Sequence, residues 1–184
     1  MKGTARISIM TDTMSPSQRH YCMASIHSSA TKPERLVRHW LWNHGYRYRL
    51  NVKGVPGKPD IVMRRYHTAI FVNGCFWHGH ENCLKYRKPK SNVEFWEKKI
   101  TRNRERDQEN YRTLQENGWQ VIVVWECQLS PKRIGQTMND VESLLNEKFL
   151  SLYRKNKQVK YVQSEESQNL PMAAEEMEYI FQKP

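Results

Sequence analysis

Residues 60–72 read Asp-Ile-Val-Met-Arg-Arg-Tyr-His-Thr-Ala-Ile-Phe-Val. Two short apolar runs rich in β-branched residues, 60–63 and 68–72, flank a polar break, and this pattern predicts an antiparallel hairpin. Further along, residues 121–125 read Val-Ile-Val-Val-Trp. Such an almost uninterrupted apolar run is typical of a central strand that is covered on both faces. These strands therefore predict a buried sheet.

Helical patterns surround the predicted strands. Residues 31–34, Thr-Lys-Pro-Glu, have the form of a capping box, so we expect a helix that starts there and stops at Gly45. Residues 46–50 alternate as a half-buried strand does. A long polar helix is expected over about 92–117, and a final helix near 136–149. The order of elements predicts an α/β fold with a mixed sheet flanked by helices.

The chain has 184 residues and a formal net charge of +11. The length suits one domain of ordinary size with a short tail. The charge favours a polyanionic partner, with nucleic acid first and an anionic membrane surface as the rival. No stretch approaches the roughly 20 apolar residues of a membrane span, and residues 1–14 lack the apolar block of a signal peptide. We therefore expect a cytoplasmic protein.

The charge is distributed unevenly along the chain. Residues 161–184 hold five glutamates and one lysine, and a basic run at 154–157 precedes them. We expect a flexible N-terminal arm over 1–14, one domain over 15–150, and a C-terminal extension over 151–184. The extension is basic and then acidic, and its composition suits a weakly ordered segment. The commonest role of such a tail is to keep the protein soluble.

Two cysteines and two histidines lie within residues 75–83, Cys-Phe-Trp-His-Gly-His-Glu-Asn-Cys. Thiolate and imidazole ligands favour zinc, and Cys127 follows the apolar strand at a point where it can supply a distant ligand. The preferred set is Cys75, His80, Cys83 and Cys127. Four protein ligands leave no position for water, which predicts a structural site. The alternative is a group of buried, unligated cysteines that pack as small apolar side chains.

Other residues in and around this segment could carry chemistry. His78, outside the ligand set, could act as a general acid or base, although a lone loop histidine is more often exposed and inert. Asp60 at a strand start and Glu34 on the first helix offer hard oxygens for Mg²⁺, although an aspartate after proline often only caps a turn. Phe76 and Trp77 could wedge between base pairs, or one of them could cover the zinc cluster.

Taken together, these residues resemble the very-short-patch repair (Vsr) endonucleases, a branch of the restriction-endonuclease-like nucleases. The matching segments are 31–34, 56–60, 74–80, 94–96, Asn103 with Arg106-Asp107, 118–119 and 125–127. They span about Ser15 to Leu150. The resemblance implies a restriction-endonuclease-like sheet and a magnesium-dependent DNA endonuclease. It would nick one strand 5′ to the mispaired T of a T:G mismatch and so start very short patch repair.

The resemblance also implies individual roles. Asp60 and the backbone carbonyl of Val72 would bind magnesium, with His78 as the catalytic histidine and Glu34 as a supporting acid. The family's zinc ligands fall on the same four residues as the spacing selects. The residues expected to contact DNA are Met23, Phe76, Trp77, Trp96, Lys99 and Asn103. The three aromatic residues of this set would form a wedge beside the mispair, and Met23 would enter from the other groove. Lys99 and Asn103 would lie on the helix that reads the mismatch.

Two departures from the family pattern stand out. Asn73 occupies the position where some relatives have a second active-site histidine, and residues 18–22 differ from the basic arm expected before Met23. Two alternatives stay open: a restriction-type endonuclease acting on matched DNA, and a non-catalytic zinc-dependent DNA-binding module. The expected partner is duplex DNA with a T:G mismatch, bound by a monomer in the bacterial cytosol without membrane contact. Mismatch-repair proteins and a DNA methyltransferase are the protein partners to consider.

Overall fold

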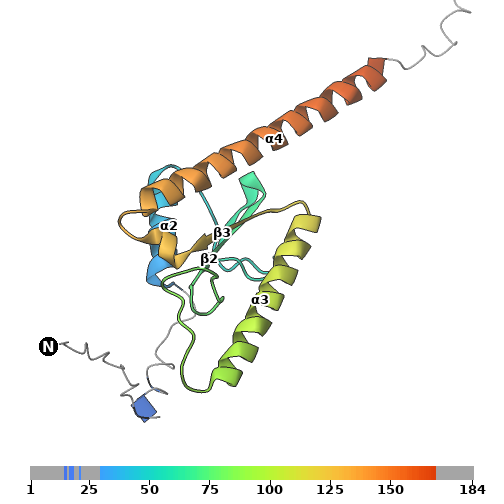
Figure 1. Cartoon of the computed structure of the whole chain (residues 1–184). Helices are drawn as coiled ribbons and strands as arrows, with labels where there is room; N and C mark the ends of the chain where they lie inside the picture. The colour runs from blue at the N-terminus through green and yellow to red at the C-terminus, as the bar shows by residue number, and fades with distance from the viewer. Residues whose placement is uncertain (1–14, 16, 19–20, 22–29, 169–184) are drawn as a thin grey trace, which may run out of the picture.

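The computed structural model describes residues 15, 17–18, 21 and 30–168. Its elements, in chain order, are α2 (Lys32–Asn43), β1 (Ile61–Met63), η1 (Arg64–Tyr66), β2 (Thr68–Asn73), α3 (Val93–Glu116), β3 (Gln120–Trp125), η2 (Glu126–Leu129) and α4 (Ile134–Gln168) (Figure 1). The flexible arm over 1–14 and the role of Met23 were expected for residues outside this range, so both stay predictions.

The sheet has the order β1-β2-β3. β1 and β2 run antiparallel, with Ile61 opposite Ile70, which confirms the predicted hairpin. β3 pairs with β2 in parallel, so the sheet is mixed. The prediction that β3 is central is wrong, because β2 lies between the other two strands. An apolar run such as that of β3 indicates that both faces of a strand are covered. It does not indicate where the strand lies in the strand order of the sheet.

The predicted strand over residues 46–50 is also largely absent from the structure. It is reduced to one isolated bridge, in which Arg49 and Val62 exchange backbone hydrogen bonds of 2.8 and 2.9 Å. Tyr46 instead lies in the core, and its hydroxyl group donates to Glu142 of α4 at 3.0 Å. The alternation of residues 46–50 therefore reflects one buried tyrosine and a short contact with β1.

Helices cover both faces of the sheet (Figure 1). On one face, Val37 and Leu41 of α2 and Leu145 of α4 pack with Ile70 and Ile122 in the larger core cluster. On the other face, Leu114 of α3 packs with Ala69 and Phe71 of β2. The predicted α/β arrangement, a mixed sheet flanked by helices, is confirmed.

Helix α4 is longer than the sequence analysis predicted. It continues to Gln168, whereas an end near residue 149 was expected. No glycine or proline occurs between Gln136 and Leu170, so the sequence holds no strong stop signal there. The helix therefore continues past residue 150 and projects from the domain (Figure 1). None of the helices in the described part of the chain is long and apolar enough to cross a membrane.

Candidate active site

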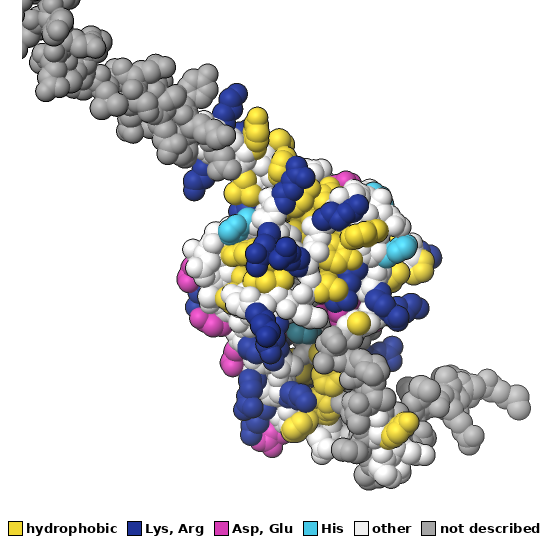
Figure 2. All heavy atoms as spheres, turned by 180° about the vertical axis from the view of Figure 1, so that it is seen from behind, with side chains coloured by type: hydrophobic (Ala, Val, Ile, Leu, Met, Phe, Trp, Pro, Cys, Tyr) yellow, Lys and Arg dark blue, Asp and Glu magenta, His cyan; other side chains and the backbone are white. Residues whose placement is uncertain are grey.

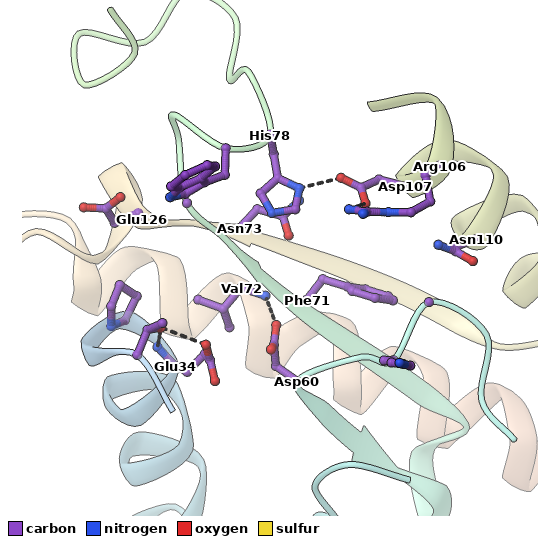
Figure 3. Close-up of a pocket in the computed structure, with 16 residues that line it drawn as sticks. Glu34, Asp60, Phe71, Val72, Asn73, His78, Arg106, Asp107, Asn110 and Glu126 are labelled. Carbon is purple, nitrogen blue, oxygen red and sulfur yellow. Dashed lines mark hydrogen bonds and ion pairs between the residues drawn. The ribbon is translucent and has the colours of Figure 1, made fainter. Parts of the chain in front are cut away.

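A cavity of about 890 Å³ opens where β2 ends, between the start of α2 and the middle of α3. It brings together five of the residues selected from the sequence, and Asn73 and Asp107 line it as well (Figure 3). The five are Glu34, Asp60, Val72, Trp77 and His78. Five separate segments of the chain therefore contribute to one site: residues 31–34, 57–60, 71–78, 106–110 and Glu126.

Asp60 stands immediately before β1, after the buried Pro59. Its Oδ2 atom accepts a 2.7 Å hydrogen bond from the backbone N–H of Val72, which fixes the carboxylate against β2 (Figure 3). Burial raises the pKa of Asp60 above its ordinary value, and the negative charge of Glu34 adds to this, while the Val72 hydrogen bond opposes it. A bound cation would relieve the cost of keeping this carboxylate charged.

Glu34 lies in the cavity wall with 3% of its surface exposed. Its carboxylate accepts hydrogen bonds from the Ala30 N–H (2.9 Å) and the Thr31 hydroxyl (2.8 Å). Arg38, one turn later, forms a 2.8 Å ion pair with it. The expected capping box is present in a modified form, because Glu34 reaches the N–H of Ala30 instead of that of Thr31. Glu34 is thus a paired, fixed negative charge beside Asp60.

His78 pairs with Asp107 of α3, a residue to which the sequence analysis gave no role. The Nδ1 atom of His78 is hydrogen bonded to Oδ2 of Asp107 (Figure 3), and Arg106 donates to Oδ1 at 3.0 Å. Burial alone would raise the pKa of Asp107, but the bonds from His78 and Arg106 outweigh it, so the pKa lies below its usual value. A charged Asp107 holds the proton on Nδ1, which leaves Nε2 as the atom for proton transfer.

α3 also fixes the backbone of the loop that carries His78. Asn103 donates from its amide to the Trp77 carbonyl at 2.9 Å, and Arg104 donates to the His78 carbonyl at 3.4 Å and to the Gly79 carbonyl. Gly79 has φ +57° and lies so close to Ile100 that an added Cβ would sit 2.5 Å from it. Asn103, expected to read the mismatch, thus already uses its amide on this loop.

Four aromatic side chains form a cluster beside the cavity, which we call the aromatic cluster: Phe76, Trp77, Phe95 and Trp96. The ring centroids of Trp77 and Trp96 are 5.9 Å apart. The Lys99 ammonium lies 5.6 Å from the ring of Trp77. Phe95, which the sequence analysis did not select, is 57% exposed. The cluster is thus a partly exposed apolar surface with a cation over it.

The ligand atoms of Cys75, His80, Cys83 and Cys127 lie within 4.8 Å of one another. His80 Nδ1 is 3.6 Å from the Cys75 sulfur and 3.4 Å from the Cys127 sulfur. A tetrahedral zinc site, with Zn–S near 2.3 Å and Zn–N near 2.0 Å, requires a separation of roughly 3.5 Å. The four residues could therefore hold a metal ion in a closed site. Trp125 stacks on His80 with a centroid distance of 4.0 Å.

Comparison of the sequence with known proteins places this chain among DNA endonucleases. The family model for the DNA mismatch endonuclease Vsr matches residues 11–85. A type II nicking enzyme of Neisseria meningitidis is 53% identical over 125 residues, which is 68% of this chain and 89% of that enzyme. A type II nicking enzyme of Xanthomonas oryzae is 48% identical, covering 66% of this chain and 88% of its own length.

The DNA mismatch endonuclease Vsr of Escherichia coli is 38% identical over 120 residues, which is 65% of this chain and 76% of that protein. The chain belongs to the Vsr family of DNA mismatch endonucleases. The resemblance that the motifs indicated is thereby confirmed.

Proposed function

We propose that this protein nicks one strand of duplex DNA on the 5′ side of the mispaired T in a T:G mismatch, using magnesium. The observation that carries the proposal is the cavity in which Asp60 and the His78–Asp107 pair meet, next to the aromatic cluster. A similar protein of Escherichia coli bears the name DNA mismatch endonuclease, and others are named nicking enzymes. These names support cleavage of one strand at a mispair.

Asp60 and the carbonyl of Val72 are the groups that would hold magnesium, since hard oxygens are its preferred ligands. When bound, magnesium would polarise the phosphate and activate water. His78 would transfer the proton at Nε2, with Asp107 holding the ring in one tautomer. Water would form the new bond to phosphorus as the bond to the leaving sugar oxygen breaks. Glu34, paired with Arg38, would support the charge balance around Asp60.

The selection of the mispair would rest on the aromatic cluster. A T:G mispair lowers the cost of unstacking, so Phe76, Trp77 and Trp96 could enter the duplex there. Lys99 lies over this cluster, where its ammonium group can contact DNA. Met23 and Asn103 would complete the contacts, Met23 from the other groove. A matched duplex resists the same wedge, which supports mismatch selection over the restriction-type alternative.

The remaining assignments concern the fold and the second metal. The four-residue Cys/His set would hold zinc as a structural ion, because its soft and borderline ligands suit zinc and close the coordination sphere. The mixed sheet with helices on both faces supports a restriction-endonuclease-like domain over residues 15–150, with 151–184 as an extension. The protein would act as a monomer, with mismatch-repair proteins or a DNA methyltransferase as further partners.

A nicking assay tests the proposal directly. The full-length protein is incubated with T:G, other mismatched and fully matched duplexes in several flanking sequences, with and without Mg²⁺. We expect nicking of the T strand of T:G duplexes only when Mg²⁺ is present. Equal cutting of matched DNA would favour the restriction-type alternative. Binding without any cutting would favour the DNA-binding module.

A further inference from the structure

The cavity wall carries six charged Asp, Glu, Lys and Arg side chains, and four of them form ion pairs. The carboxylates are Glu34, Asp60, Asp107 and Glu126, and the cations are Lys58 and Arg106. Glu34 pairs with Arg38 at 2.8 Å, Asp107 pairs with His78 and Arg106, and Glu126 pairs with Lys85 at 3.2 Å. Asp60 and Lys58 are the two charged residues of the wall that form none of these ion pairs.

Neither Asp60 nor Lys58 forms an ion pair with any residue that the structure describes, although the charge of Arg38 acts on Asp60 and opposes the rise in its pKa. Asp60 accepts its hydrogen bond from the Val72 N–H, and the Lys58 ammonium has neither a hydrogen bond nor an ion pair in the described part of the chain. Although only two positions separate them, they form no ion pair with each other. Asp60 and Lys58, an anion and a cation without ion-pair partners, thus both line the same cavity.

The backbone holds Lys58 in this place in an unusual conformation. Gly57 and Lys58 are both left-handed, with φ values of +74° and +50°. A lysine adopts this conformation rarely, because its Cβ crowds the following carbonyl. Gly57 is pressed against α3 and β2, since an added Cβ would lie 2.9 Å from Asn110 and 3.2 Å from Phe71. Pro59, which follows Lys58, is fully buried and has a fixed φ.

Strain of this kind persists where the surrounding packing enforces it, and it is concentrated at functional sites. A lysine that served only solubility would need neither the left-handed backbone nor a place in the wall of the cavity. A cation bound at Asp60 and the ammonium of Lys58 would offer two positive charges to one anionic group between them. A phosphodiester has this chemistry, because its two non-bridging oxygens share a negative charge.

We propose that Lys58 binds a non-bridging oxygen of the phosphodiester that is cut and stabilises the charge that grows on it during hydrolysis. This assignment rests on the proposed function. Lys58 would neither give nor take a proton. Its contribution would be larger in the transition state than in the bound substrate, because the phosphoryl oxygens gain negative charge as water adds.

The test compares Lys58→Gln with Lys58→Arg and with Lys53→Gln, which removes an exposed lysine of the same loop that does not line the cavity. Single-turnover nicking of T:G duplex is measured at saturating enzyme with Mg²⁺, and binding is measured without Mg²⁺. Melting temperature and zinc content establish that each variant is folded.

We expect Lys58→Gln to lower the nicking rate by roughly 100-fold, the effect of removing one preorganised donor to a developing charge. Binding should weaken by less than about tenfold, as for one phosphate contact among several. Lys58→Arg should retain most of the rate, and Lys53→Gln should match the unaltered protein. A wild-type rate for Lys58→Gln, or an equal loss of rate in Lys53→Gln, overturns the assignment. Failure of the unaltered protein to nick any duplex rejects the proposed function itself, and the role of Lys58 with it.

Discussion

His78 and Asp107 are 29 positions apart in the chain, and yet their side chains form a hydrogen-bonded pair in the wall of the cavity. The sequence predicts His78, because a histidine inside a metal-binding loop is a recognisable pattern. It assigns no role to Asp107, which belongs to the matching pair Arg106-Asp107 but occurs among many charged residues on a polar helix. The pairing depends on how α3 docks against the loop through Asn103 and Arg104. Such docking has no signature in local sequence.

Asp107→Asn should therefore slow nicking strongly while leaving DNA binding nearly intact. An asparagine amide can present N–H to Nδ1 and favour the wrong tautomer, and general acid–base catalysis is worth about 100- to 10,000-fold. The measurement is the single-turnover rate on T:G duplex with affinity determined in parallel. Glu109→Gln, on the exposed side of the same helix, serves as the control. An Asp107→Asn rate within threefold of that control would remove the pair from the mechanism.

Asp60→Asn tests the other side of the cavity. The amide oxygen can still accept the hydrogen bond from Val72, but it binds magnesium poorly, so nicking should be abolished. Because burial and Glu34 raise the pKa of Asp60, the charged carboxylate opposes folding near neutral pH. The variant should accordingly melt at the same temperature as the unaltered protein or higher. Nicking by Asp60→Asn at the original rate would contradict the magnesium assignment.

At the scale of elements, the sequence predicts best what local patterns determine. Thr31 caps the start of α2, and Gly118 follows closely on the end of α3. Polar residues separate the two strands of the hairpin. The predicted position of β3 in the strand order is wrong, because strand order depends on which strands pair and not on apolar content. The length of α4 was underestimated because a helix without a stop signal continues beyond its buried face.

The Cys/His set connects two elements that are distant in sequence, the loop after β2 and the turn η2 after β3. Cys127→Ser should lower zinc content and melting temperature together, since structural zinc contributes directly to folding. A loss of a few kcal/mol corresponds to roughly 5–10 °C in a chain of this size. Cys22→Ser, which changes the cysteine outside the set, should alter neither quantity. Purified protein that is folded and free of zinc would contradict the closed site.

At the scale of the whole molecule, we propose that residues 151–184 are an extension that the fold of the domain does not require. The aromatic contact of Phe149 with Tyr66, at 5.6 Å, lies near the end of the region in which α4 packs on the domain. The relative from Neisseria meningitidis aligns over 89% of its length with only 68% of this chain. Removal of residues 155–184 should therefore preserve melting temperature, zinc content and nicking of T:G duplex. A truncated protein that fails to fold or to nick would show that the extension belongs to the domain.

The proposed mismatch selection would be a property of the whole protein with its DNA, and Trp77 provides its sharpest test. Its ring contacts Phe76 at 5.2 Å and lies beneath the Lys99 ammonium, in a cluster that is only partly buried. If the ring stacks on a base beside the mispair, its loss removes about 1–3 kcal/mol of binding, or roughly 5- to 150-fold.

Trp77→Ala should thus weaken binding to T:G duplex more than binding to matched duplex, with little change in melting temperature. A tryptophan that mainly fills the core would behave differently, because its removal would cost roughly 3–5 kcal/mol of stability and impair both duplexes equally. Thermal melting and affinity for both duplexes, measured on one preparation, separate these outcomes. A large fall in melting temperature with an unchanged preference for T:G would place Trp77 in the core. Recognition of the mispair would then fall to Lys99 and to Phe95, the most exposed ring of the cluster.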